Sequence, residues 1–179
     1  MKFKFDININ DDDFYKFNEF IILRSPYGKK SMMSLRLAIV VMLGLFSVMS
    51  FVMNGVTKGT LIALIPTAAL ILIMQLVLNP VMKSTLKKQL KTMSDSFSPK
   101  AAMEVYEDKI VYNDKDGEHN LRLGALERVS IIKGKYVYLH ASSSKGYIIP
   151  MESFESGEQY AEFESLLKEK CKEINYYKK

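Results

Sequence analysis

Residues 35–53, LRLAIVVMLGLFSVMSFVM, and residues 60–79, TLIALIPTAALILIMQLVLN, are two apolar runs with a short break between them. No Asp, Glu, Lys or Arg lies between Arg36 and Lys58, or between Lys58 and Lys83. Each interval exceeds the ~20 apolar residues that cross the ~30 Å hydrocarbon core of a bilayer as a helix. The two runs therefore predict a transmembrane hairpin over residues 35–80, and the short connector makes the two helices antiparallel neighbours.

The basic residues beside these runs predict the orientation of the hairpin in the membrane. Four lie before or at the start of the first run and four follow the second, whereas the connector carries Lys58 alone. The eight flanking residues are Arg24, Lys29, Lys30, Arg36, Lys83, Lys87, Lys88 and Lys91. Cytoplasmic loops of membrane proteins carry an excess of Lys and Arg. We therefore expect a protein of the cell membrane with two spans in the lipid bilayer and both termini in the cytoplasm.

Residues 81–95 form a basic juxtamembrane segment that Pro80 is expected to separate from the second span. Val81, Met82, Leu86, Leu90 and Met93 fall near one face of a helix. The lysines of this segment, which lie on other faces, are candidate contacts with anionic lipids at ~1 kcal/mol each: Lys83, Lys87, Lys88 and Lys91. The alternative is that these lysines only set the topology.

Small residues within the two spans predict where the helices pack together. Close approach of helices in lipid depends on small side chains, because apolar burial gives no net driving force there. The candidate packing residues are Gly44, Ser47 and Ser50 in the first span and Ala63, Thr67 and Ala68, around Pro66, in the second. The same faces also allow the alternative of a homo-oligomeric membrane assembly.

Residues 1–30 predict a strand followed by an amphipathic helix. In MKFKFDININ, apolar residues alternate with polar ones, which is the pattern of a half-buried strand. Asn10 or Asp11 is expected to cap a helix over residues 14–22, and residues 25–28, SPYG, are expected to end it. Because an isolated strand with an apolar face needs a partner, we expect this strand to join the sheet of the C-terminal domain with the helix packed nearby.

Residues 96–179 are expected to form a cytoplasmic C-terminal domain, after a polar linker over residues 94–100. About six short apolar stretches follow at intervals of 8–12 residues, with a hairpin turn at Asp114–Gly117. Ser156 or a neighbour is expected to cap a final amphipathic helix. The expected fold class is α+β: a transmembrane hairpin plus an antiparallel sheet or barrel closed by a C-terminal helix, as in pleckstrin-homology-like domains.

Several segments are together similar to the YcxB-like family. They are KFKFDININ at the N-terminus, FNEFIILRSPYGKK before the first span, YIIPMESF at residues 147–154, and a last helix ending in LLKEK. The most specific of them are SPYG at residues 25–28 and YIIPMESF. The resemblance covers nearly the whole chain and implies a small bacterial membrane protein with a pleckstrin-homology-like C-terminal domain. It implies no activity.

The sequence offers little chemistry, so we expect no enzyme, no cofactor and no metal. His119, His140 and Cys171 do not form a zinc ligand set, and neither Gly-rich phosphate motif occurs. The remaining polar groups have structural explanations: capping by residues 11–13, a Ser-rich turn at residues 142–145, and isolated amides at Gln75 and Asn79. The net charge of +5 is concentrated beside the apolar runs, which argues against a nucleic-acid partner.

Two classes of function remain. The first is a non-catalytic, membrane-anchored cytoplasmic module that binds a protein, a peptide or a lipid head group. Its candidate contacts are basic residues in loops, which are otherwise a solvated rim: Arg122, Arg128, Lys133 and Lys135. The second is an accessory subunit of a membrane enzyme or transporter, which would need a polar cluster within the spans.

Overall fold

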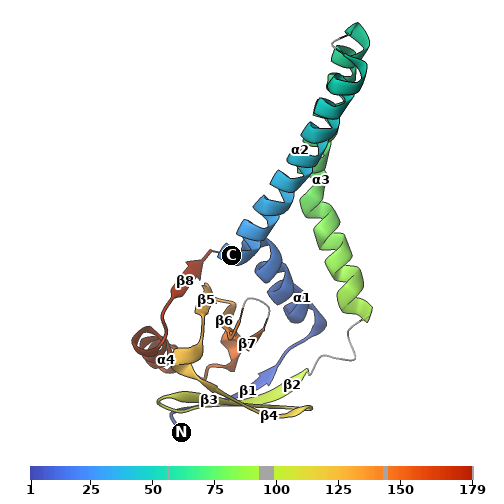
Figure 1. Ribbon diagram of the computed structural model, residues 1–179. Coiled ribbons are helices and arrows are strands. Elements are labelled where there is room, and N and C mark those ends of the chain that lie inside the picture. The colour runs from blue at the N-terminus through green and yellow to red at the C-terminus, as the bar shows by residue number, and fades with distance from the viewer. Residues whose placement is uncertain (56, 93–98, 143–144, 179) are drawn as a thin grey trace. The chain divides into compact units, whose positions relative to one another are not determined.

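The computed structural model describes residues 1–55, 57–92, 99–142 and 145–178 (Figure 1). Two compact units make up the chain, and each is described by itself. The β unit comprises Met1–Phe17 and Thr92–Lys179, and the hairpin unit comprises Asn18–Lys91. The class is α+β with two long apolar helices, as the sequence predicts.

The first sheet of the β unit contains the N-terminal strand. Its order is β1-β2-β3-β4 and all of its pairings are antiparallel, with Phe5 opposite Met103. This confirms that residues at the start of the chain join strands that follow the apolar hairpin. The turn between β3 and β4 is the predicted Asp114–Gly117 turn. The strand bounds are β1 Phe3–Asn8, β2 Lys100–Val105, β3 Lys109–Asp114 and β4 Gly117–Arg122.

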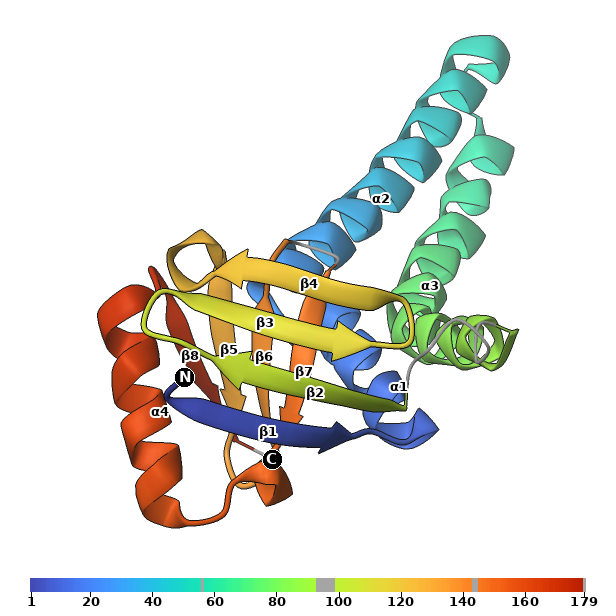
Figure 2. The same cartoon turned by 90° about the horizontal axis from the view of Figure 1, so that it is seen from below.

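The second sheet has the order β7-β6-β5-β8 (Figure 2). The strands therefore form two separate sheets, and the alternative of a closed barrel is not observed among the described residues. The expectation that a helix ends the domain is wrong, because residues 174–177, INYY, form a further strand. That strand pairs in parallel with β5, which is possible because helix α4 carries the chain back across the sheet. The bounds are β5 Arg128–Ile132, β6 Tyr136–His140, β7 Gly146–Pro150, α4 Gly157–Lys170 and β8 Ile174–Tyr177.

Aromatic rings form the core between β1 and α4. Phe5 is fully buried, and the centre of its ring lies 4.9 Å from that of Phe154 and 5.3 Å from that of Phe163. Figure 2 shows α4 alongside the start of β1, where the ring of Phe3 meets that of Phe163 at 5.5 Å. Ser156 caps α4, as predicted, by accepting a hydrogen bond from the backbone N–H of Gln159 at 3.1 Å. Short 3₁₀ turns at Leu123–Ala125 (η3) and Met151–Ser153 (η4) complete the domain.

Helix α1, Asp11–Glu19, begins with a reciprocal cap. The Asn10 side chain accepts the Asp13 N–H at 2.9 Å, and the Asp13 carboxylate accepts the Asn10 N–H at 3.1 Å. This confirms the predicted capping role of the acidic run. Within the β unit, the Phe17 ring packs edge-on against Tyr138 at 5.0 Å, and the Tyr136 hydroxyl donates to Asp13.

Residues 25–28, SPYG, lie at the junction between two helical segments of the hairpin unit. The expectation that they end a helix is therefore only half right, because they also begin the next one. A π-helical turn, η1 (Phe20–Arg24), ends at Ser25, and Pro26 opens α2, Pro26–Asn54. The buried Ser25 hydroxyl accepts the Gly28 N–H at 3.0 Å and donates to the Ile21 carbonyl at 2.6 Å. Proline is favoured in the first turn of a helix, because the N–H it lacks would have no partner there.

Helix α3, Lys58–Thr92, runs through both Pro66 and Pro80. The expected break at Pro80 is therefore wrong, because the helix continues although proline removes one of its hydrogen bonds. Among the described residues, two helices are long and apolar enough to cross a membrane, Pro26–Asn54 and Ile65–Thr92. The most apolar 18-residue window of the first has a mean hydropathy of 2.3, and that of the second has 1.9. No residue of either most apolar window is buried.

Candidate functional site

The four lysines predicted to contact lipid lie on exposed positions of α3. Lys83 forms an ion pair with Glu19, with a nitrogen–oxygen distance of 2.7 Å. One of the four lysines is therefore paired with a carboxylate of the hairpin unit itself. Lys87, one turn further along the helix, has an exposed side chain. A role of these lysines at anionic lipid stays a prediction.

The small residues predicted to bring the spans together make local contacts. Among the described residues, no atom of another element lies within 4 Å of the position that a Cβ on Gly44 would occupy. The Ser47 hydroxyl donates to the Leu43 carbonyl at 3.0 Å, and the Ser50 carbonyl accepts from the Asn54 amide at 3.0 Å. Thr67 is half-buried and Ala68 exposed, whereas the side chain of Ala63 lies outside the described residues. Packing between these residues stays a prediction.

A polar contact that the sequence analysis missed joins the two long helices. The Arg36 guanidinium donates through Nη2 to the Asn79 side-chain oxygen at 3.1 Å. Arg36 is the second residue of the first apolar run and Asn79 is the last residue of the second, so the contact lies where both runs meet their basic flanks. The signal in the sequence was the isolated amide of Asn79, whose partner was not apparent because it lies 43 positions earlier.

The prediction that Arg128 is an exposed basic loop residue is wrong. Arg122, Lys133 and Lys135 are exposed, but Arg128 is the first residue of β5 and only 8% exposed. It stands opposite His140, which is fully buried and lies 3.1 Å from the Ser130 hydroxyl through Nε2. The signal was present in RVSII, where Arg128 and Ser130 alternate with apolar residues and so share one face of a strand.

His140 predicts a fall in stability on acidification. Burial, and then the charge of Arg128, lower the pKa of His140 to about 4. An unfolded histidine titrates near 6.5. Below that pH the unfolded chain therefore binds a proton that the folded chain rejects, and by pH 5 about 2 kcal/mol of the stability present above pH 7 should be lost.

Denaturant unfolding of the full chain at pH 7.5 and pH 5 measures this loss, with His140→Gln as the test variant. The test variant should lose less stability than the unaltered chain between the two pH values. His119, whose side chain is 38% exposed, supplies the matched control, since His119→Gln should leave the loss as it is. Equal losses in all three proteins would show that His140 does not cause the effect.

The remaining polar candidates have structural roles. Cys171 is half-buried at the end of α4, where its thiol lies 3.8 Å from the Leu123 carbonyl and burial raises its pKa to about 11. The Ser142 hydroxyl accepts the Lys145 N–H at 3.0 Å within a turn. Over the described residues, no three His, Cys, Asp or Glu side chains gather in a way that could hold a metal ion.

An aromatic cleft lies within the β unit, between α1 and the ends of β3, β4 and β7. It encloses about 190 Å³. The rings of Tyr112 and Tyr147, each 8% exposed, meet at 4.7 Å between centroids, and Phe14 and Phe17 of α1 line another part of the wall. We define the aromatic cleft and its rim by the side chains of Phe14, Phe17, Tyr112, Asp114, His119, Lys145 and Tyr147.

Gly146 provides the space for the ring of Phe17. A Cβ at this position would lie 2.9 Å from the Phe17 ring and 2.8 Å from the Leu139 carbonyl oxygen. Both distances are shorter than real Cβ contacts allow, so any larger residue would have to displace a ring and a backbone atom. The absence of a side chain in β7 therefore lets α1 supply an aromatic wall to the cleft.

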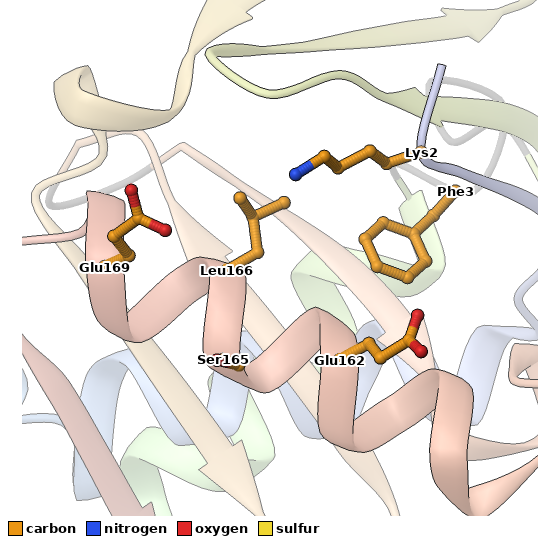
Figure 3. A pocket seen from close by; sticks show the side chains of 6 residues that line it. All are labelled: Lys2, Phe3, Glu162, Ser165, Leu166 and Glu169. Carbon is orange, nitrogen blue, oxygen red and sulfur yellow. The ribbon is translucent and has the colours of Figure 1, made fainter.

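A second pocket lies between the start of β1 and α4 and encloses about 430 Å³ (Figure 3). Phe3 and Leu166 form its apolar part, but each is only 6% exposed. Two of its charged side chains already have partners in the chain: Lys2 pairs with Glu107 at 3.4 Å and Glu169 with Lys170 at 2.7 Å. Its third charged side chain, Glu162, forms no ion pair within 4.0 Å among the described residues, but no aromatic ring other than that of Phe3 lines this pocket.

The family model described as YcxB-like protein matches residues 105–167. Searches of the curated proteins and of the solved structures gave no match. The matched residues run from the last residue of β2 into α4, and they include Tyr112, Asp114 and Tyr147 of the aromatic cleft. The resemblance noted in the sequence is confirmed over this stretch, and residues 105–167 are similar to the YcxB-like family.

Proposed function

We propose that the chain is a membrane-anchored binding module of the cytoplasm, in which α2 and α3 cross the cell membrane and the β unit binds a ligand without catalysing a reaction. The observation that carries this proposal is the pairing of β1 with β2. These strands precede and follow the hairpin unit, yet they are neighbours in one sheet. Both must therefore lie on the same side of any membrane.

This pairing supports two spans rather than one. A chain that leaves and returns to the same side crosses a membrane an even number of times, so a membrane-spanning α2 requires a membrane-spanning α3. The pairing also argues against α2 as a cleaved signal sequence, since cleavage would remove β1 and its buried Phe5 from the sheet.

Exposed apolar side chains on both long helices support insertion into lipid. On α2, Leu45 is 61% exposed and Phe46 is 72% exposed, and on α3, Leu76 is 77% exposed. Soluble monomers rarely expose contiguous apolar surface of more than a few hundred Å². Insertion among lipid tails removes such surface from water. The basic residues at the start of α2 and at the end of α3 favour the cytoplasmic side for both termini.

The β unit supports a pleckstrin-homology-like binding domain as the cytoplasmic part. Four antiparallel strands form one sheet, β5, β6 and β7 form the antiparallel part of the other, and α4 packs against the start of β1. The aromatic cleft is the best-formed candidate for the ligand site of this domain, because it combines buried rings with a carboxylate.

Thiol labelling of intact cells tests the topology. A reagent that cannot cross the membrane should label Lys58→Cys, at the start of α3, and should not label Asp116→Cys, in the β3–β4 turn, until the cells are permeabilised. Both variants are made in a Cys171→Ala background. Cys171 is a poor nucleophile because burial raises its pKa, and its removal leaves one reactive thiol per protein.

Detergent-solubilised protein supplies the control, since both cysteines should react fully there. Labelling of Asp116→Cys in intact cells, with Lys58→Cys protected, would reverse the proposed orientation. Equal labelling of both cysteines in intact cells, with a cytoplasmic marker protein protected, would refute the two-span arrangement.

A further inference from the structure

We propose that the aromatic cleft binds the organic ammonium group of a small molecule or lipid head group. This inference rests on the proposed function as a binding module and deepens it by naming the chemistry of the ligand. The first reason is the wall of the cleft. The electron-rich faces of Tyr and Phe attract organic cations, and rings from three elements meet here: Tyr112 of β3, Tyr147 of β7 and Phe17 of α1.

The second reason is a sheltered carboxylate beside those rings. The Asp114 side chain is 16% exposed, and its Oδ1 atom accepts the Asp116 N–H at 2.9 Å. Its negative charge raises the pKa of Tyr112 and of Tyr147, although burial contributes more at both residues. The charge of Asp114 therefore acts on the two tyrosine rings of the wall, where an ammonium group would contact both the aromatic faces and the carboxylate.

The third reason is that Asp114 has no permanently charged partner among the described residues. His119 Nε2 lies 3.6 Å from Oδ1, but this imidazole is 38% exposed and carries a charge only when protonated. Lys145 lines the cleft, yet no ion pair within 4.0 Å joins it to Asp114. A sheltered carboxylate without a fixed counter-charge favours a cationic ligand over an anionic one.

The size of the cleft limits what can enter. A volume of about 190 Å³ suits a small head group and is too small for a folded partner or a long peptide. Ethanolamine and choline groups are of this size, and they occur both free and on phospholipids. The shared chemistry is the ammonium group, and the experiment separates the two sources.

Calorimetric titration of the full chain in a maltoside detergent tests the inference. Choline and ethanolamine are the ligands, and 3,3-dimethylbutan-1-ol, the uncharged analogue of choline, is the control. We expect saturable binding of at least one ammonium compound and at least about tenfold weaker binding of the uncharged analogue. Equal binding of choline and its analogue, or no binding of either ammonium compound, would overturn the inference without any variant.

Two variants locate the site. Asp114→Asn keeps an oxygen for the Asp116 N–H and removes the charge, so it should weaken ammonium binding about tenfold or more. Lys145→Gln should leave binding unchanged or strengthen it. If binding depends on Lys145 and not on Asp114, the cleft recognises an anion and the inference is wrong. Far-UV circular dichroism checks that both variants are folded.

Nanodiscs distinguish the source of the ammonium group. If ethanolamine phospholipid supplies it, free choline should bind more weakly in discs that contain this lipid than in discs of phosphatidylglycerol alone. Equal choline binding in both discs would identify a soluble ligand. Because labelling tests the membrane anchor and calorimetry tests the cleft, the failure of one experiment is distinguishable from the failure of the other.

Discussion

Gly28→Ala should destabilise the hairpin unit by about 3 kcal/mol, at the upper end of the usual cost of overpacking. A Cβ on Gly28 would clash with the carbonyl oxygens of Ile21 and Ile22. These are backbone atoms of the π-helical turn, so no flexible side chain can move aside. The Ser25 hydroxyl bonds on both sides of the joint, to Ile21 and to Gly28, and the added methyl group would force these contacts apart.

Thermal unfolding in detergent, followed by circular dichroism of the helices, measures this effect. Gly44→Ala is the matched control, because it makes the same change in the same helix at a position with open space around it. Alanine there should stabilise α2 by up to about 1 kcal/mol through its helix propensity. If Gly28→Ala unfolds at the same temperature as Gly44→Ala, the close approach between η1 and α2 does not constrain the fold.

Phe5→Ala should destabilise the β unit by about 3–5 kcal/mol, the range for removing a buried phenylalanine. Phe5 is fully buried, and its ring meets Phe3 at 6.2 Å in addition to Phe154 and Phe163. The substitution would leave a cavity between β1 and α4 that these large rings cannot fill by small movements. Because Phe5 belongs to β1, the effect also measures how far the domain depends on the N-terminal strand.

Hydrogen exchange of the full chain locates this effect. Amides of β2 and β3 should exchange faster in Phe5→Ala, while those of α2 should keep their rates. The neighbouring Lys4 is exposed on the same strand, so Lys4→Ala is the control. The free energy of opening that protects the sheet amides should change by no more than about 0.5 kcal/mol in this variant. Unchanged protection of β2 in Phe5→Ala would mean that β1 contributes little to the sheet.

Local patterns predicted much of the fold. Alternation in MKFKFDININ gave β1, the Asp–Gly signal gave the β3–β4 turn, and Ser156 gave the start of α4. These features depend on the few residues that form them. The pairing of β1 with strands of the C-terminal part was also predictable, because an apolar strand face needs a partner and the other predicted strands all lie there.

Other features depend on contacts between distant residues, and the sequence did not predict them. The SPYG motif lies where one helical segment ends and another begins. The buried Ser25 hydroxyl bonds to Ile21 on one side and to Gly28 on the other, and these contacts were not apparent in the sequence. Strand β8 is short, and its partner β5 lies more than 40 residues earlier. The aromatic cleft is assembled from α1, β3, β4 and β7, so no single stretch of sequence contains it.

The pairing of β1 with β2 has a consequence for biosynthesis. Asn8 and its partner Lys100 are 92 positions apart (100 − 8), and a ribosome adding 5–20 residues per second needs roughly 5–20 s to make that interval. During this time β1 is an unpaired strand whose phenylalanines have nothing to cover them. The nascent chain therefore completes its first sheet only after the whole hairpin has been synthesised, and a chaperone that shields β1 in the meantime would raise the yield of folded protein.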